Sequence, residues 1–423
     1  MHVTTDLDFD LVAVEQEDQI TLMFELAAPP APPGHERAPT TVQAVLDRSG
    51  SMGGERLYTA LVALDRLVAR LDARDRFGLV AFDDTVNIVV PAGQLHDQDL
   101  VRRAIAAIDV GGTTNLSAGY ARGVQEARRV ATDTGATVLL LSDGMANVGV
   151  CEPEQLERLA AGAQRHRITT TTLGLGLGFD EVLLSAIARG GAGSAYFAEE
   201  PDAAAAYIAG EIDGLLSQAA QAANLVIRPT GDVASVTLHN DLPVTGIEDG
   251  VMVELGDLLY DETRRLVLTL AVPAMPALGL AKVADLTLSY VELPALTTHT
   301  IEIPVHVNVV PGDQAAGRIP DPVVTSELAF QQAQHGKRRA GEALRGGDAD
   351  AAVRAYKESA DRLDEALPSA PDEMRSDLAA EASLLREMAD RVAWGDHARL
   401  SKFGESDQAH KTRKRGRRRP EDS

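Results

Sequence analysis

Residues 45–54, with the sequence VLDRSGSMGG, place an acid and two hydroxyl groups directly after an apolar stretch. Asp47, Ser49 and Ser51 alternate along this segment. All three side chains carry oxygen, which is the ligand atom that hard divalent cations prefer. The glycines at positions 50, 53 and 54 allow a tight backbone turn and would leave a bound ion accessible.

A second acid and a threonine occupy comparable positions later in the chain. Asp143 ends the apolar segment LLLSDG, and Thr114 lies in GGTTN, directly before a predicted helix. Polar side chains at the carboxyl ends of parallel strands meet at one edge of a sheet. Two carboxylates that converge there raise the pKa of one of them or require a cation. The sequence therefore predicts one site for Mg²⁺ or Mn²⁺, with Ca²⁺ as an alternative, formed by Asp47, Ser49, Ser51, Thr114 and Asp143.

Helix capping and catalysis account for these residues less well than a metal site does. For one loop alone, a turn in which Ser or Asp caps the next helix fits equally well, but three such loops favour a ligand site. An aspartyl phosphatase needs a second carboxylate two residues after its nucleophile, and Ser49 holds that position. The chain has no G-x-S-x-G elbow and no Walker A segment. We therefore expect no enzymatic activity, and we keep a metal-dependent hydrolase as a weaker alternative.

The surrounding pattern predicts the sheet that such a site needs. Between residues 40 and 218, short apolar segments such as TVQAVL alternate with segments of helical periodicity such as RLYTALVALDRLVARL. This alternation predicts a doubly wound, mainly parallel α/β sheet with helices on both faces. Residues 220–312 change to short strands separated by Pro, Gly and Asp, which predicts an all-β sandwich.

The two ends of the chain complete the predicted organisation. Residues 1–28 contain two apparent strands that cannot be stable alone, so we assign this hairpin to the sandwich and expect the α/β domain to be inserted into it. Residues 320–398 are predicted to be helical, either as a tetratricopeptide-like hairpin or as a plain bundle. Residues 399–423 are predicted to be a disordered basic tail, because seven of the nine residues from Lys411 to Arg419 are basic.

The three polar loops together resemble the metal-ion-dependent adhesion site (MIDAS) of von Willebrand factor type A (vWA) domains, as found in bacterial proteins. DRSGSM has the Asp-x-Ser-x-Ser pattern, and DRFGLVAF and LLLSDGMANVG extend the resemblance over about residues 40–218. The resemblance implies direct coordination of the ion by Ser49, Ser51 and Thr114, with Asp47 and Asp143 acting partly through water. It also implies a protein-binding function, with a non-catalytic subunit of an ATPase or chelatase-type complex as the alternative.

Composition limits the kinds of partner. The net charge of −23 disfavours contact with nucleic acid or an anionic membrane, apart from contacts made by the basic tail. The single cysteine, Cys151, excludes an internal disulfide. The sequence has no segment typical of a leader peptide and no run of about eighteen apolar residues, so we expect a cytoplasmic protein. The expected partner is a protein that presents Asp or Glu to the ion, while its identity and the oligomeric state stay open.

Overall fold

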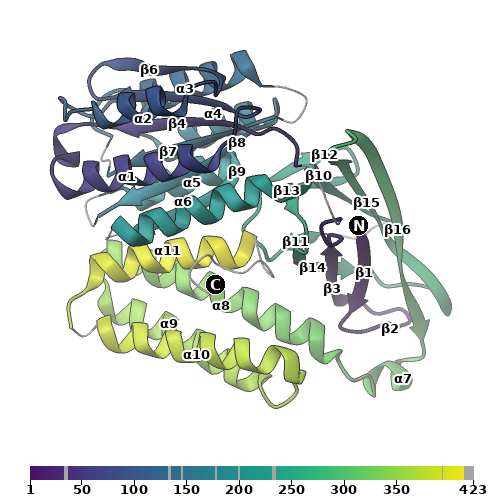
Figure 1. Cartoon of the computed structure of the whole chain (residues 1–423). Helices are drawn as coiled ribbons and strands as arrows, with labels where there is room; N and C mark the ends of the chain where they lie inside the picture. Colours follow the sequence, from purple (N-terminus) through teal and green to yellow (C-terminus); the bar gives the residue numbers. More distant parts are fainter. Residues whose placement is uncertain are drawn as a thin grey trace.

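The chain folds into three parts that pack against one another: an α/β unit, a pair of β sheets and a group of C-terminal helices (Figure 1). The structure is a computed structural model and describes residues 1–32, 37–131, 135–143, 146–176, 179–198, 201–230, 235–392 and 394–413. Among these residues, none of the helices combines the length and the apolar character needed to span a bilayer.

The α/β unit is built on a six-stranded sheet with the strand order β6-β5-β4-β7-β8-β9. All neighbouring pairs are parallel except β5 and β6. The strands are β4 (Thr41–Asp47), β5 (Arg76–Phe82), β6 (Val86–Gln94), β7 (Ala136–Ser142), β8 (Ile168–Leu175) and β9 (Ala192–Ala198). The helices are the short 3₁₀ helix η1 (Gly50–Met52), α1 (Glu55–Arg70), α2 (Gln98–Ala106), α3 (Leu116–Val130), α4 (Pro153–Gln164), α5 (Glu181–Gly190) and α6 (Pro201–Leu216).

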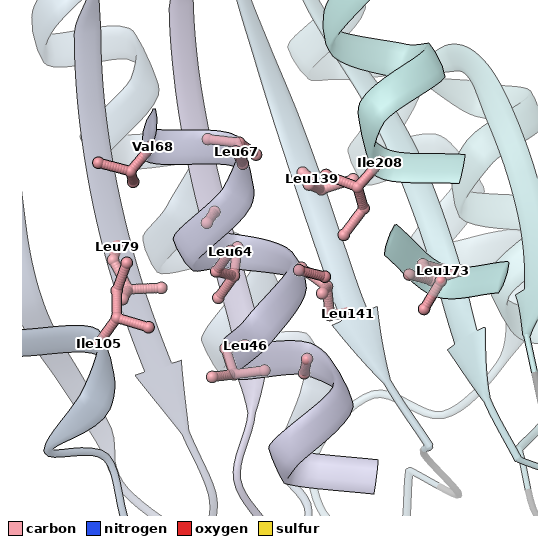
Figure 2. Packing of buried hydrophobic residues seen from close by; sticks show 14 of the residues in the cluster. Leu46, Leu64, Leu67, Val68, Leu79, Ile105, Leu139, Leu141, Leu173 and Ile208 are labelled. Carbon is pink, nitrogen blue, oxygen red and sulfur yellow. The ribbon is translucent and has the colours of Figure 1, made fainter. Parts of the chain in front are cut away.

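Helices cover both faces of this sheet, which confirms the predicted doubly wound fold. Successive residues of a strand point to opposite faces. Leu46 of β4 therefore packs with α1, α2 and α6, whereas its neighbour Val45 packs with α3, α4 and α5. Figure 2 shows the first of these layers, in which Leu64 of α1 and Ile208 of α6 face the leucines of the sheet. Because both faces are covered, the central strands β4 and β7 are buried along their whole length.

The β region consists of a four-stranded sheet, β1-β3-β14-β11, and a six-stranded sheet, β12-β13-β10-β15-β16-β2. Apolar residues of both sheets form one shared core, as expected for two sheets packed face to face. Its strands are β1 (His2–Leu7), β2 (Leu11–Ala13), β3 (Asp18–Ala27), β10 (Gln218–Pro229), β11 (Val236–Leu238), β12 (Val244–Ile247), β13 (Gly250–Leu259), β14 (Thr263–Val272), β15 (Gly279–Glu292) and β16 (Thr297–Val310).

The N-terminal segment differs from the single hairpin that its pattern predicts. β1 pairs antiparallel with β3, but β2 crosses to the other sheet and pairs parallel with β16. The break occurs at Asp8, whose carboxylate accepts hydrogen bonds from the backbone N–H groups of Phe9 (2.8 Å) and Thr21 (2.7 Å). These bonds end the first strand and turn the chain toward the second sheet.

The C-terminal helices are α7 (Gly312–Ala316), α8 (Pro322–Arg345), α9 (Ala349–Ala366), α10 (Asp372–Val392) and α11 (His397–Arg413). Helix α11 packs on α8 and also contacts α5 and β9, so it lies between the bundle and the α/β unit (Figure 1).

The prediction of a disordered tail over 399–423 is therefore wrong for residues 399–413. Lys402 of α11 is buried and contacts Glu181 of the α/β unit (2.6 Å), and Leu400 packs in the core of the bundle. Burial of apolar surface and pairing of these charges stabilise a segment whose composition alone suggests exposure to solvent. Residues 414–423, which include most of the basic run, lie outside the described residues.

Candidate metal centre

The predicted site residues lie at the carboxyl ends of two adjacent central strands. Asp47 is the last residue of β4, and Asp143 directly follows the last residue of β7. The two strands are parallel neighbours in a register that sets Leu46 beside Leu141. This register, which depends on the strand order, brings together two acids that are far apart in the sequence.

Hydrogen bonds link the first loop directly to the third. The Ser51 hydroxyl donates to Asp143 Oδ1 (2.8 Å), and the hydroxyl oxygens of Ser49 and Ser51 lie 3.2 Å apart. Asp47 Oδ1 accepts the backbone N–H of Ser49 (2.8 Å), and Asp47 Oδ2 accepts the hydroxyl of Ser142 (2.6 Å). Four of the five predicted residues therefore form one connected cluster.

Neither serine of the first loop caps a helix through its side chain. Ser49 is the N-cap residue of η1 but makes no side-chain capping bond, and Gly54 occupies the N-cap of α1. The alternative of a simple helix-capping turn is therefore wrong for this loop, because its hydroxyls are directed toward each other and toward Asp143.

Backbone hydrogen bonds hold the second loop beside the first. The N–H of Gly50 donates to the Gly112 carbonyl (2.8 Å), and the N–H of Gly111 donates to the Arg48 carbonyl (2.6 Å). Thr114 is buried, and its N–H donates to the side-chain oxygen of Asn147 (3.1 Å). This bond ties Thr114 to the segment that follows the third loop, so among the described residues Thr114 stands outside the connected cluster of the other four.

An ion pair beside these loops explains the first glycine of GGTTN. Arg48 and Asp83 form a salt bridge (2.8 Å) that joins the first loop to the end of β5. A Cβ atom at Gly111 would lie 1.8 Å from Asp83 Oδ2, so any other residue here would displace the Asp83 side chain. Although burial opposes it, hydrogen bonds from Thr85 and the charge of Arg48 hold the pKa of Asp83 below its usual value.

The electrostatics of the cluster favour a cation. Asp47 is completely buried, and this burial raises the pKa of its carboxyl above the usual value, with the nearby charge of Asp143 acting in the same direction. Hydrogen bonds from Ser142 and Ser49 oppose this rise only in part. Two buried carboxylates beside neutral hydroxyls form a donor set of oxygen atoms alone, which fits Mg²⁺ or Mn²⁺.

Two contributors to the site were not predicted from the sequence. Ser142 contacts Asp47, and Arg56 of α1 donates from Nη1 to Asp143 Oδ2 (2.7 Å) and to the Ser51 carbonyl (3.1 Å). Ser142 directly precedes a predicted site residue, which is a weak signal. Arg56 has no comparable signal, because an arginine in the first turn of a helix is ordinarily exposed to solvent.

Comparison with known proteins identifies the family of the α/β unit. Residues 42–210 match the family model described as von Willebrand factor type A domain. The uncharacterized protein sll0103 of Synechocystis sp. is 31% identical over 245 residues, which are 55% of this chain and 57% of that protein. The chain therefore spans little more than half the length of this bacterial relative.

Two solved structures share the fold over most of their length. The ArnB paralog VWA2 from Sulfolobus acidocaldarius superposes with a TM-score of 0.68 at 17% identity, covering 98% of each chain. A von Willebrand factor type A protein from Catenulispora acidiphila superposes with a TM-score of 0.70 at 14% identity, covering 92% of this chain and 96% of that one. At these identities the likeness concerns the fold, including the β region and the C-terminal helices.

Proposed function

Because residues 42–210 form a von Willebrand factor type A domain, we propose that this chain is a non-catalytic, metal-dependent protein-binding protein. Domains of this family commonly mediate metal-dependent protein interactions. The proposed ligands of the ion are Asp47, Ser49, Ser51, Thr114 and Asp143.

The connected cluster of carboxylates and hydroxyls carries this proposal. Ser51 donates to Asp143, and the hydroxyl oxygen of Ser49 lies 3.2 Å from that of Ser51, so oxygen atoms from two loops lie side by side, which supports a shared ion. The ion would be Mg²⁺ or Mn²⁺, with Ca²⁺ as an alternative, and when bound it supplies a Lewis acid for an incoming oxygen ligand. The serines and the threonine add no charge, so the ion would keep affinity for one more carboxylate.

The proposed partner is a protein that presents Asp or Glu to this ion. The chain carries a net charge of −23, so long-range electrostatics do not attract an acidic partner and the local cation must do so. Exposed apolar side chains on the same loops support a protein ligand rather than a small anion. The exposed residues are Val110, which directly precedes the glycines of the second loop, and Val148, whose N–H donates to the Thr114 carbonyl (3.2 Å).

A second candidate is a non-catalytic subunit that docks on an ATPase or chelatase-type machine through its helices. The observation that favours it is Trp394, which lies between α10 and α11 and is 87% exposed. Large exposed aromatic side chains are enriched at protein interfaces. A Trp394→Ala variant that loses an ATPase partner while retaining metal binding would support this candidate.

The main proposal is tested by metal titration of the intact chain. We expect calorimetry to show Mn²⁺ binding at one site, and Ser51→Ala to weaken it at least about tenfold, because one direct oxygen ligand is lost without a change in charge. Ser369→Ala changes an exposed serine in the helical region and should leave the affinity unchanged. No binding at millimolar metal, or equal binding by Ser51→Ala, would refute the site.

The binding role and the absence of catalysis need a second experiment. Capture of a partner on the immobilised chain should require Mg²⁺, should fail in chelator and should fail with Ser51→Ala in Mg²⁺. Addition of free glutamate at high concentration should compete if a carboxylate completes the site. Robust substrate turnover that depends on Asp47 would instead favour the metal-dependent hydrolase.

A further inference from the structure

The side chain of Arg56 occupies an unexpected position at the edge of the metal centre. We propose that Arg56 is a built-in counter-ion that competes with the divalent ion for Asp143 and so sets the metal concentration at which the site fills. This inference rests on the proposed function, because it concerns the affinity of the same site.

Arg56 contacts two of the proposed ligand residues. Its Nη1 donates to Asp143 Oδ2 (2.7 Å) and to the backbone carbonyl of Ser51 (3.1 Å). The Asp143 side chain is completely buried, while 39% of the Arg56 side chain is exposed. Arg56 therefore reaches inward from the surface to neutralise a buried carboxylate.

The fold provides space for this contact. Gly54, with a φ of 83°, turns the chain into α1 just before Arg56. On the opposite side, Gly176 leaves room for the guanidinium, since a Cβ atom there would lie 2.7 Å from Arg56 Nε. Gly54 thus sets the direction in which α1 begins, and the missing side chain at Gly176 leaves room for Arg56 to lie against Asp143.

The two oxygens of Asp143 show why the arginine and an ion compete. Oδ1 accepts the Ser51 hydroxyl, and Oδ2 accepts Arg56. Asp47 and Asp143 together contribute two negative charges, and Arg56 contributes one positive charge, which leaves a net charge of −1. A divalent ion bound to Asp143 would meet a cation on the same carboxylate, so its binding is weakened unless Arg56 moves outward into solvent.

Replacing Arg56 by a neutral residue should therefore strengthen metal binding. We expect Arg56→Gln to lower the Kd for Mn²⁺ about tenfold, which is the order of effect of one unit charge close to a divalent ion in a solvated site. Glutamine keeps a polar end but removes the charge. Arg56→Ala is a second neutral variant and should change the Kd in the same direction.

A matched control separates the local effect from the overall charge. Arg66 lies ten residues further along α1, about 15 Å away along the helix axis, and Arg66→Gln makes the same change in net charge. This control variant should leave the Kd unchanged. Arg56→Lys keeps the charge and should bind Mn²⁺ more weakly than the two neutral variants do.

The measurement is calorimetric titration of the full chain with Mn²⁺, accompanied by thermal unfolding in chelator. The neutral variants should have a lower melting temperature in chelator, because Asp143 loses its counter-ion, and a larger rise on addition of Mn²⁺. Equal or weaker Mn²⁺ binding by both neutral variants, with wild-type binding intact, overturns the inference alone. An equal gain in Arg66→Gln also overturns it. No binding by wild type or variants overturns the proposed metal site together with the inference.

Discussion

The Asp47→Asn variant should show whether Asp47 is a ligand of the metal ion or an acid with a purely structural role. In chelator, asparagine preserves the shape of the side chain and can still accept the N–H of Ser49 through Oδ1. The substitution weakens the contact with Ser142 but removes a buried charge and its repulsion with Asp143. Because these effects oppose each other, we expect the free energy of unfolding in chelator to change by no more than about 1 kcal/mol.

The difference should appear when metal is added. Metal at 100 times its Kd stabilises the wild-type chain by about 2.7 kcal/mol. Residues 42–210 form a domain of a size at which each kcal/mol corresponds to about 2–4 °C. Mn²⁺ should therefore raise the melting temperature of the wild-type domain by about 5–10 °C, and Asp47→Asn should lose nearly all of this rise.

Differential scanning calorimetry in Mn²⁺ and in chelator measures both quantities. Asp65→Asn is the matched control, because it makes the same charge change on the exposed side of α1, where Asp65 pairs with Arg102 (2.6 Å). It should keep the full metal-induced rise. If Asp47→Asn is strongly destabilised in chelator, or if it retains the rise in Mn²⁺, then Asp47 is a structural acid and not a ligand of the ion.

Three further predictions concern the parts that support the site. Lys337→Met should lower the free energy of unfolding by about 2–4 kcal/mol in urea titration, because Glu381 and Asp407 lose their fully buried counter-ion and keep only the partly exposed Lys411; a loss below about 1 kcal/mol would contradict this. Gly111→Ala should displace Asp83, destabilise the domain by about 1–3 kcal/mol and weaken Mn²⁺ binding in calorimetry, whereas unchanged affinity would show that the second loop tolerates the shift. Burial lowers the pKa of both His239 and His335, so the unfolded chain binds more protons than the folded chain as the pH falls below about 6.5, and the folded state loses stability there. His335→Gln should therefore reduce the difference between the urea midpoints measured at pH 7.5 and 5.5, whereas an unchanged difference would assign the pH dependence to other groups.

The two wrong predictions, for the N-terminal hairpin and for the tail, have a common cause. Asp8 divides the predicted first strand because its carboxylate binds the N–H of Thr21, thirteen residues away. Helix α11 forms where composition predicts a disordered tail because Lys402 reaches Glu181, 221 residues earlier in the chain. Local composition contains no information about such distant partners, so it predicts a continuous strand at Asp8 and disorder in a segment whose Lys402 is in fact buried and paired.

Features that depend on near neighbours in the chain could be predicted without a structure. Apolar periodicity identifies strands that are buried on both faces, and an acid with alternating hydroxyls after such a strand identifies the first loop of the site. These are properties of a few consecutive residues. The fold class and the positions of Asp47, Ser49 and Ser51 can therefore be predicted from the sequence.

The way in which the loops meet depends on tertiary packing. Ser142 contacts Asp47 across 95 residues, and Arg56 contacts Asp143 across 87. Both contacts exist because β4 lies beside β7 in a defined register, although more than eighty residues separate the two strands in the chain. Strand order results from packing the whole sheet between two layers of helices, and the local pattern of any one segment is compatible with several such orders. The charge that Arg56 brings to the site is therefore a property of the assembled fold.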